Sequence, residues 1–101
     1  MGFGNLAKMA QQMQTQMARV EEELQALRLT GTAGGGAVSA VVTGKQELLS
    51  VEIDPGVADP EDVEMLQDLV TAAVGDALRQ AREEAERRMG AVTGGMRIPG
   101  L

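Results

Sequence analysis

The chain contains no cysteine, histidine, tryptophan or tyrosine, and Phe3 is its only aromatic residue. Without cysteine and histidine there are no disulfides, no thiol or imidazole catalysts and no usual ligands for zinc, haem or iron–sulfur clusters. Without several aromatic side chains there is no platform on which nucleic-acid bases could stack. We therefore expect no cofactor and no metal.

Long apolar runs are also absent. No stretch approaches the ~18 residues that a bilayer-spanning helix requires, and the N-terminus lacks the basic and then apolar pattern of a signal peptide. We expect a cytoplasmic protein with no membrane contact.

The 101 residues fit one domain whose core is made of aliphatic side chains and seven methionines. So small a core favours completion by a second copy of the chain.

The spacing of apolar residues predicts a helix over residues 5–28. Leu6, Met13, Val20 and Leu27 lie seven residues apart, which is the stripe of a coiled-coil-like helix. The opposite face is rich in glutamine. A methionine stripe at this spacing indicates packing rather than a cofactor site.

Residues 29–54 predict a three-stranded antiparallel sheet. Strands are expected over residues 29–33, 38–43 and 47–53, because apolar and polar residues alternate and glycine-containing turns separate the runs. The glycine run 34–36 is a strand connection rather than a phosphate loop, because neither a Gly-Lys-Ser/Thr ending nor a helix follows it.

A second, longer helix is predicted over residues 60–89. Asp59 is expected to cap it, Pro60 to occupy its first position and Gly90 to end it. Its apolar face passes from large residues to alanine along the chain, which permits a close approach of another element or leaves the distal half less buried. Residues 91–101 are expected to form a mobile tail.

The net charge of −6 is unevenly distributed along the second helix. Residues 59–78 contain six acidic and no basic residues, whereas residues 79–101 contain five arginines and three glutamates. Acidic residues near a helix start and basic ones near its end complement the helix dipole, so a solvated surface explains much of this pattern. The basic end is also where an anion could bind.

Carboxylates alone do not indicate an enzyme here. Glu52 and Asp54 fit a solvated strand face and a turn better than acid–base catalysis, since no cleft is expected around them. Asp59, Glu61 and Asp62 lack the glycine spacing of a calcium loop. We expect neither catalysis nor a small-molecule substrate.

Four motifs occur in order: a Gln- and Met-rich segment at residues 6–17, the pentapeptide Val51-Glu52-Ile53-Asp54-Pro55, the run at residues 64–73 and Gly94-Gly95-Met96. With the order of helix, three strands and long helix, they resemble the YbaB/EbfC family of bacterial nucleoid-associated proteins over nearly the whole length. The resemblance implies an α+β fold and a tweezer-like homodimer whose long helices project from a central sheet. It also implies binding to double-stranded DNA.

The candidate DNA-binding residues are the basic side chains of the two helices. We expect phosphate contacts, because arginine can donate two hydrogen bonds to one anion and nothing resembles a recognition helix. Sequence specificity should therefore be low. The resemblance further implies that binding can alter DNA conformation, organise the nucleoid and influence gene expression. The candidate DNA-binding residues are Lys8, Arg19, Arg79, Arg82, Arg87 and Arg88.

The acidic balance and the methionines leave an alternative open, a protein-binding adaptor that uses its helices without touching DNA.

Overall fold

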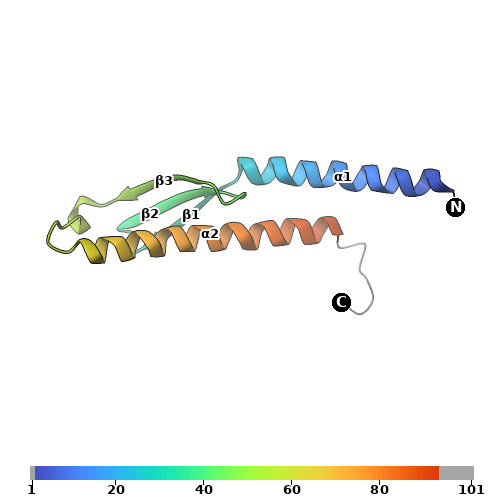
Figure 1. Ribbon diagram of the computed structural model, residues 1–101. Coiled ribbons are helices and arrows are strands. Elements are labelled where there is room, and N and C mark those ends of the chain that lie inside the picture. Colours follow the sequence, from blue (N-terminus) through green and yellow to red (C-terminus); the bar gives the residue numbers. More distant parts are fainter. Residues whose placement is uncertain (1, 94–101) are drawn as a thin grey trace, which may run out of the picture.

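A computed structural model describes residues 2–93 of an elongated molecule, with extents of 70 × 29 × 16 Å. The predicted α+β order of helix, three-stranded antiparallel sheet and long helix is confirmed (Figure 1). A short 3₁₀ turn, η1, lies between the sheet and the second helix. The elements are α1 (Phe3–Ala26), β1 (Arg28–Ala33), β2 (Val38–Thr43), β3 (Leu48–Ile53), η1 (Pro55–Val57) and α2 (Val63–Thr93).

The sheet has the order β1-β2-β3 and is antiparallel throughout. A run of three glycines joins β1 to β2, and Gly34, Gly35 and Gly36 all have positive φ, a conformation that other residues rarely adopt. The register between β2 and β3 shifts at Val41 and Val42, where β3 carries a bulge. The glycine run is therefore a strand connection, as its sequence predicts.

The core lies between α2 and one face of the sheet, and it is built from small side chains. Gly31 of β1 lies directly on the helix, where an added Cβ would come within 2.3 Å of the Ala73 carbonyl oxygen and of the Ala77 nitrogen. The alanines of α2 thus allow the sheet, rather than another helix, to approach closely. The fully buried apolar residues at this contact are Val38, Ala40 and Val42 of β2 and Ala73, Ala77 and Ala81 of α2.

The first helix begins and ends earlier than the sequence predicts. It runs from Phe3, and it ends at Ala26 rather than at residue 28. The β2–β3 turn closes the helix, because the backbone N–H of Gly44 donates to the carbonyl oxygen of Leu24 at 2.8 Å. An added Cβ at Gly44 would lie 2.7 Å from that oxygen, so this glycine is required for contact with α1.

The predicted ends of the second helix are also wrong. Asp59 does not cap it: its side chain accepts a hydrogen bond from Glu61 N (2.9 Å) within a turn, and Pro60 lies outside the helix. Asp62 caps α2 instead, by accepting from Met65 N at 3.2 Å. At the other end α2 continues through Gly90 to Thr93. Residues 91–93 are therefore helical, and the remainder of the predicted tail lies outside the described residues.

Side chains of α2 occupy the outer edge of the sheet at β1. Asp76 Oδ2 accepts a hydrogen bond from Thr32 N at 3.1 Å, and Gln80 Nε2 donates to the Thr30 carbonyl oxygen at 3.0 Å. These groups belong to an edge strand, whose unpaired backbone would otherwise be open to another strand. The β1 edge is therefore capped from within the chain.

Candidate nucleic-acid interface

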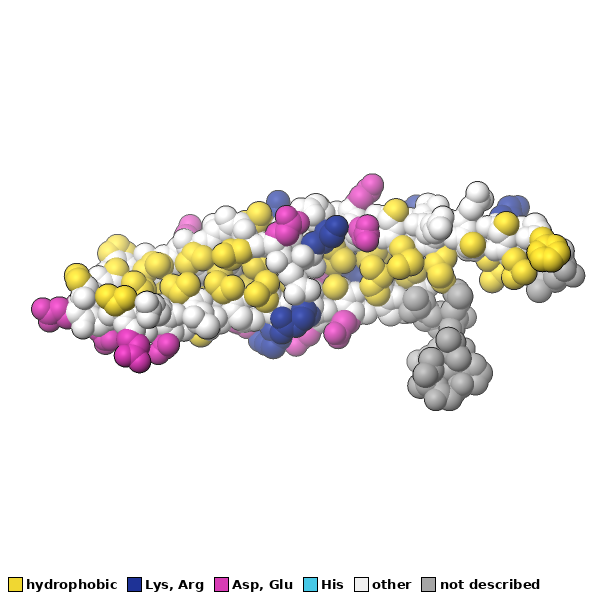
Figure 2. Space-filling model, viewed as in Figure 1, with side chains coloured by type: hydrophobic (Ala, Val, Ile, Leu, Met, Phe, Trp, Pro, Cys, Tyr) yellow, Lys and Arg dark blue, Asp and Glu magenta, His cyan; other side chains and the backbone are white. Residues whose placement is uncertain are grey.

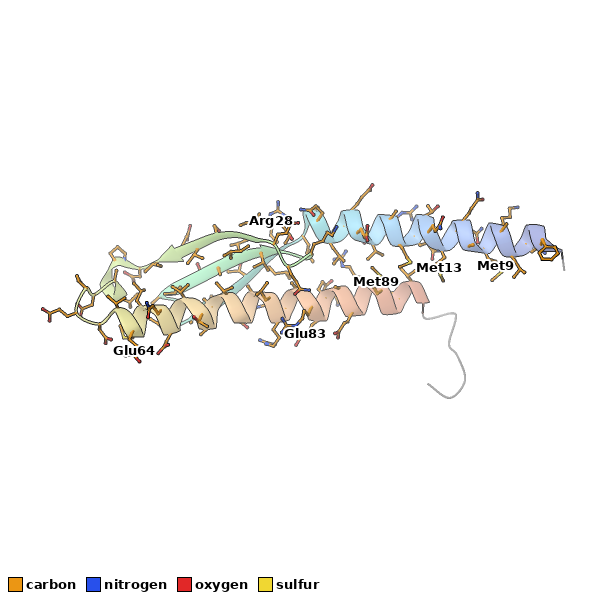
Figure 3. All side chains as sticks on the ribbon, viewed as in Figure 1. Met9, Met13, Arg28, Glu64, Glu83 and Met89 are labelled. Carbon is orange, nitrogen blue, oxygen red and sulfur yellow. The ribbon has the colours of Figure 1, made fainter. Side chains whose placement is uncertain are left out.

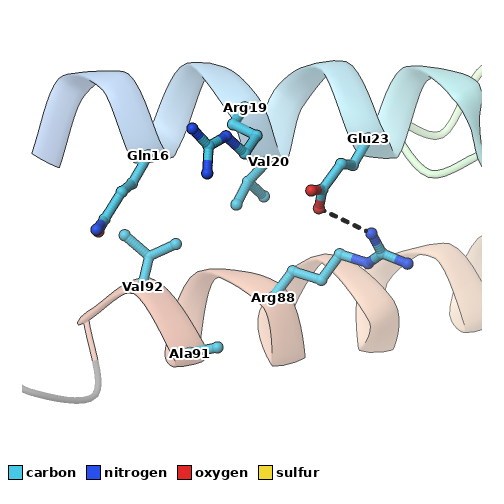
Figure 4. A pocket seen from close by; sticks show the side chains of 7 residues that line it. All are labelled: Gln16, Arg19, Val20, Glu23, Arg88, Ala91 and Val92. Atoms are coloured by element: carbon cyan, nitrogen blue, oxygen red, sulfur yellow. Dashed lines mark hydrogen bonds and ion pairs between the residues drawn. The ribbon is translucent and has the colours of Figure 1, made fainter. Parts of the chain in front are cut away.

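The first two predicted contacts, Lys8 and Arg19, lie on one exposed face of α1. They are eleven residues apart, close to three helical turns, so their side chains leave the helix on the same side. The N-terminal part of α1 extends beyond the end of α2 (Figure 1). Lys8 therefore lies on the projecting part of α1, whereas Arg19 lies where α1 faces the end of α2 (Figure 4).

Arg79 of α2 is held between two carboxylates. Its guanidinium lies 2.6 Å from Asp76 Oδ1 and 3.2 Å from Glu83 Oε1. The hydrogen bond that Arg79 donates to Asp76, followed by the one that it donates to Glu83, raises the pKa of Arg79. The pKa of Asp76 is lowered, chiefly because Thr32 N–H donates to it. Arg79 and Glu83 lie four residues apart on α2, a spacing at which opposite charges can pair on a helix. Most of this arginine's charge is balanced locally.

Arg87 and Arg88 belong to a chain of ion pairs that links the two helices. Glu84 accepts from both arginines, and Arg88 Nη1 also lies 3.0 Å from Glu23 Oε2 of α1 (Figure 4). Hydrogen bonds from Arg87 and then Arg88 lower the pKa of Glu84. The Glu23–Arg88 pair borders an open groove of about 340 Å³ between α1 and α2, on which Arg19 also lies. Neither Arg87 nor Arg88 is an unbalanced positive charge.

Arg82 differs from its neighbours on α2. It is exposed, and within residues 2–93 it makes no ion pair, although Glu86 lies four residues further along the helix. Lys8 and Arg19 likewise have no carboxylate partner in the described part of the chain. The structure thus divides the six predicted residues into three unpaired cations (Lys8, Arg19, Arg82) and three paired ones (Arg79, Arg87, Arg88).

Two further cations were missed by the sequence analysis. Arg28 lies where α1 meets the sheet, and its Nη1 donates only to the backbone carbonyls of Gln25 (3.0 Å) and Leu27 (3.1 Å). Lys45 is exposed in the β2–β3 turn. Both side chains lie outside the arginine-rich stretch of the second helix, so clustering in the sequence could not indicate them. Each of them leaves its charge available to an anion.

The helices also carry apolar surface. Met9 and Met13 project from α1 on the side that faces α2, and Met89 projects from α2 toward α1 (Figure 3). A groove of about 490 Å³ lies along this part of α1 and is lined mainly by apolar residues, including Leu6, Met9 and Val92. This is the surface that the adaptor alternative would use.

Other kinds of site receive no support from the described residues. Within residues 2–93 no three Asp, Glu, His or Cys side chains are grouped so that they could hold a metal ion. None of the helices in the same range is long and apolar enough to cross a membrane. The chemical groups that the described residues present for binding are exposed cations on long helices.

The described chain consists of two long helices and one three-stranded sheet, and exposed cations lie on both helices. The model of the YbaB/EbfC DNA-binding family matches residues 1–96. The chain therefore belongs to the YbaB/EbfC DNA-binding family, which is not a family of enzymes.

Relatives match over the full length. A nucleoid-associated protein of Alkaliphilus metalliredigens is 52% identical over 99 residues, covering 98% of this chain and 87% of that protein. One from Moorella thermoacetica is 50% identical over 104 residues and covers both proteins completely. The crystal structure of the uncharacterized protein HP0035 from Helicobacter pylori is similar in fold, with a TM-score of 0.77 and 26% identity over 96% of this chain and 99% of that one.

Proposed function

We propose that this chain is a cytoplasmic, nucleoid-associated homodimer that binds double-stranded DNA mainly through its phosphates, with little sequence specificity. The observation that carries the proposal is that Lys8, Arg19 and Arg82 have no carboxylate partner among residues 2–93, despite the acidic composition. Unpaired cations can meet phosphate without first losing a carboxylate partner. Binding along two long helices also supports a role in altering DNA conformation, organising the nucleoid and influencing gene expression.

The three unpaired candidates amount to six per dimer, which sets the expected salt dependence. If all six meet phosphate, the logarithm of affinity should fall with the logarithm of salt concentration with a slope of about −5. Fluorescence anisotropy with duplexes of unrelated sequence, at several salt concentrations, measures this slope. Absence of binding at low salt, or binding that salt does not weaken, would contradict the proposal.

A matched pair of double variants tests which arginines contribute. Arg19→Gln with Arg82→Gln removes two unpaired charges, whereas Arg79→Gln with Arg87→Gln removes two paired ones and changes the net charge equally. We expect the first variant to lose about tenfold or more in affinity near 0.1 M salt and to show a less steep slope, by 3 to 4 if all four sites per dimer meet phosphate. The second should lose less than about threefold, and equal losses would mean that the ion pairs open on DNA.

The adaptor alternative rests on the apolar groove along α1. Leu6 and Met9 are 59% and 54% exposed there, which suits an adaptable protein contact. Recovery of a stoichiometric protein partner after nuclease treatment, together with no DNA binding at low salt, would favour this function. Partner recovery that depends on intact DNA would instead support the DNA-binding proposal.

A further inference from the structure

The C-terminal end of α1 presents backbone carbonyl groups that need hydrogen-bond donors. The last carbonyls of a helix have no partner within it, and they form the negative end of the helix dipole. The last turn of α1 contains no basic residue that would offset this charge. Arg28, just beyond the end of the helix, takes this role: its Nη1 donates to the carbonyl oxygens of Gln25 (3.0 Å) and Leu27 (3.1 Å). The guanidinium of Arg28 is therefore held in place at the base of α1.

These two contacts use only one nitrogen of the guanidinium. The planar group carries N–H donors on all three of its nitrogens. The edge formed by Nε and Nη2 of Arg28 has no hydrogen-bond or ion-pair partner within residues 2–93. Two parallel N–H groups on such an edge match two oxygens of one phosphate. Arg28 thus presents a free bidentate edge while Nη1 stays bonded to the chain.

The fold brings a second cation to the same end of the sheet. Arg28 is paired with Thr43 across β1 and β2, and Lys45 follows Thr43 by two residues. The turn that carries Lys45 is fixed against α1, because Gly44 N donates to the carbonyl oxygen of Leu24 at 2.8 Å. Lys45 is exposed and has no carboxylate partner in the described part of the chain. We call Arg28 and Lys45 the junction site.

The side chain of Arg28 is directed away from α2. Gly31 of β1 faces α2, where an added Cβ would touch the helix backbone, and side chains alternate along a strand, so Arg28 belongs to the opposite face. Figure 3 shows Arg28 where α1 joins the sheet. In Figure 2 the visible basic side chains lie over the middle of the molecule and over α1, whereas the far end of the sheet and the start of α2 show only acidic ones. The junction site therefore lies toward the basic part of the molecule.

We infer that the junction site binds a phosphate of the DNA backbone, with Arg28 as a fixed anchor and Lys45 as a second cation. The inference rests on the proposed function and adds a contact outside the six candidate cations of the helices. A free side chain loses conformational freedom when it contacts a phosphate, whereas Arg28 is already ordered by two hydrogen bonds. Its charge also offsets the end of the helix dipole, which would otherwise repel a phosphate from the base of α1.

Substitution of arginine by lysine tests whether the guanidinium geometry matters. Arg28→Lys keeps the charge, but an ammonium group cannot bond to both carbonyls and still present a bidentate edge. Arg82→Lys is the matched control, because Arg82 is also exposed and without an ion pair in the described chain. In anisotropy titrations near 0.1 M salt, we expect Arg28→Lys to weaken DNA binding about three- to tenfold and Arg82→Lys less than about twofold. A loss for Arg28→Lys no larger than that for Arg82→Lys would overturn the inference.

Removal of both charges separates phosphate binding from a purely structural role. Arg28→Gln with Lys45→Gln should make the slope of log affinity against log salt concentration less steep by about 3 to 4, if both cations of both protomers meet phosphate. A role of Arg28 confined to capping α1 would lower the melting temperature and leave this slope unchanged. A folded double variant with the native slope would refute the site.

A measurement on the native protein keeps the test valid if a variant fails to fold. Arginine Nε–H signals can be followed by ¹⁵N–¹H NMR and assigned through the side-chain carbons. We expect the Arg28 signal to shift as duplex DNA is added, whereas that of Arg79, which is bound by two carboxylates, stays in place. Saturation with DNA without a shift of the Arg28 signal would contradict the inference and leave the proposed function standing.

The same signal distinguishes the junction site from the proposed function. Native protein that does not bind duplex DNA at low salt would contradict the proposed function. A shift of the Arg28 Nε–H signal on titration with inorganic phosphate would then still support the junction site as a phosphate site. The absence of a shift with either DNA or inorganic phosphate would exclude it.

Discussion

At the scale of single residues, three glycines that look alike in the sequence have different structural roles. Gly31 and Gly44 lie where a Cβ would meet backbone atoms, of α2 at 2.3 Å and of α1 at 2.7 Å. Gly75, inside α2, is exposed and has nothing within 4 Å of a Cβ position. The helix continues through this position without a packing contact in the described chain. Only the first two glycines are required by neighbouring backbone.

The exposed glycine predicts a stabilising substitution. Gly75→Ala should raise the free energy of unfolding by about 0.5 to 1 kcal/mol, because alanine loses less conformational freedom in a helix. Gly31→Ala should lower the free energy of unfolding markedly, since β1 would have to move away from α2. Urea denaturation followed by circular dichroism measures both. A destabilised Gly75→Ala protein would reveal a contact at that position outside the single chain.

At the scale of secondary-structure elements, the capped edge of β1 depends on a carboxylate. Asp76 accepts from Thr32 N and pairs with Arg79, and these contacts keep its pKa below the usual value. A group whose pKa is lowered by folding stabilises the folded state above its unfolded pKa and stops doing so as the pH falls through the folded pKa. The β1–α2 contact should therefore weaken in acid.

The substitution Asp76→Asn tests this pH dependence. The amide keeps an acceptor oxygen for Thr32 N but loses the charge, so the variant should be less stable than the native protein at pH 7. The difference should begin to shrink below the ordinary aspartate pKa of about 3.9, and it should disappear as the pH falls through the lower pKa of the folded state, where the native carboxylate becomes protonated. Thermal melts between pH 7 and pH 2 provide the comparison, with Asp68→Asn, an exposed site on the same helix, as the control. A stability difference that stays constant over this range would exclude the carboxylate's charge as the cause.

The elements were predictable from the sequence, but their ends were not. Apolar periodicity is a local signal, and it predicted both helices and all three strands. The ends depend on contacts between distant segments: α1 closes against Gly44, and Asp62 caps α2 although Asp59 and Pro60 have the more typical sequence signature. Local propensity cannot show which of two candidate residues, Asp59 or Asp62, will cap the helix once the preceding turn has formed.

The candidate site was predictable only as a set of basic residues. Their spacing on the helices is a property of the sequence, but it does not decide pairing: Arg79 pairs with Glu83 four residues away, whereas Arg82 does not pair with Glu86 in the described chain. Whether a cation remains unpaired depends on side-chain conformation and on partners that are remote in the chain. Arg88, for example, pairs with Glu23, 65 residues away. The division between paired and unpaired cations therefore requires the three-dimensional arrangement.

At the scale of the whole molecule, the net charge of −6 is a poor guide to DNA binding because the charges are separated in space. The acidic start of α2 and the sheet lie at one end, and α1 projects at the other (Figure 1). Glu64 and Arg82 are eighteen residues apart on α2, or about 27 Å along its axis. That distance is several times the Debye length of about 8 Å at 0.15 M ionic strength. Repulsion from the acidic end should scarcely reach the cations.

This separation predicts that the position of a carboxylate, rather than the total charge, controls affinity for DNA. Glu83→Gln with Glu86→Gln and Glu61→Gln with Glu64→Gln both change the net charge from −6 to −4. The first variant frees Arg79 from one partner and removes a carboxylate near Arg82, so affinity should rise about three- to tenfold at 0.15 M salt. The second should change affinity less than twofold, and its effect should grow only as salt is lowered and screening weakens. Anisotropy titrations of both variants at 0.15 M and 0.02 M salt measure the contrast. Equal gains at 0.15 M would mean that DNA contacts the acidic end as well, and the phosphate-binding surface would then have to extend over the whole length of α2.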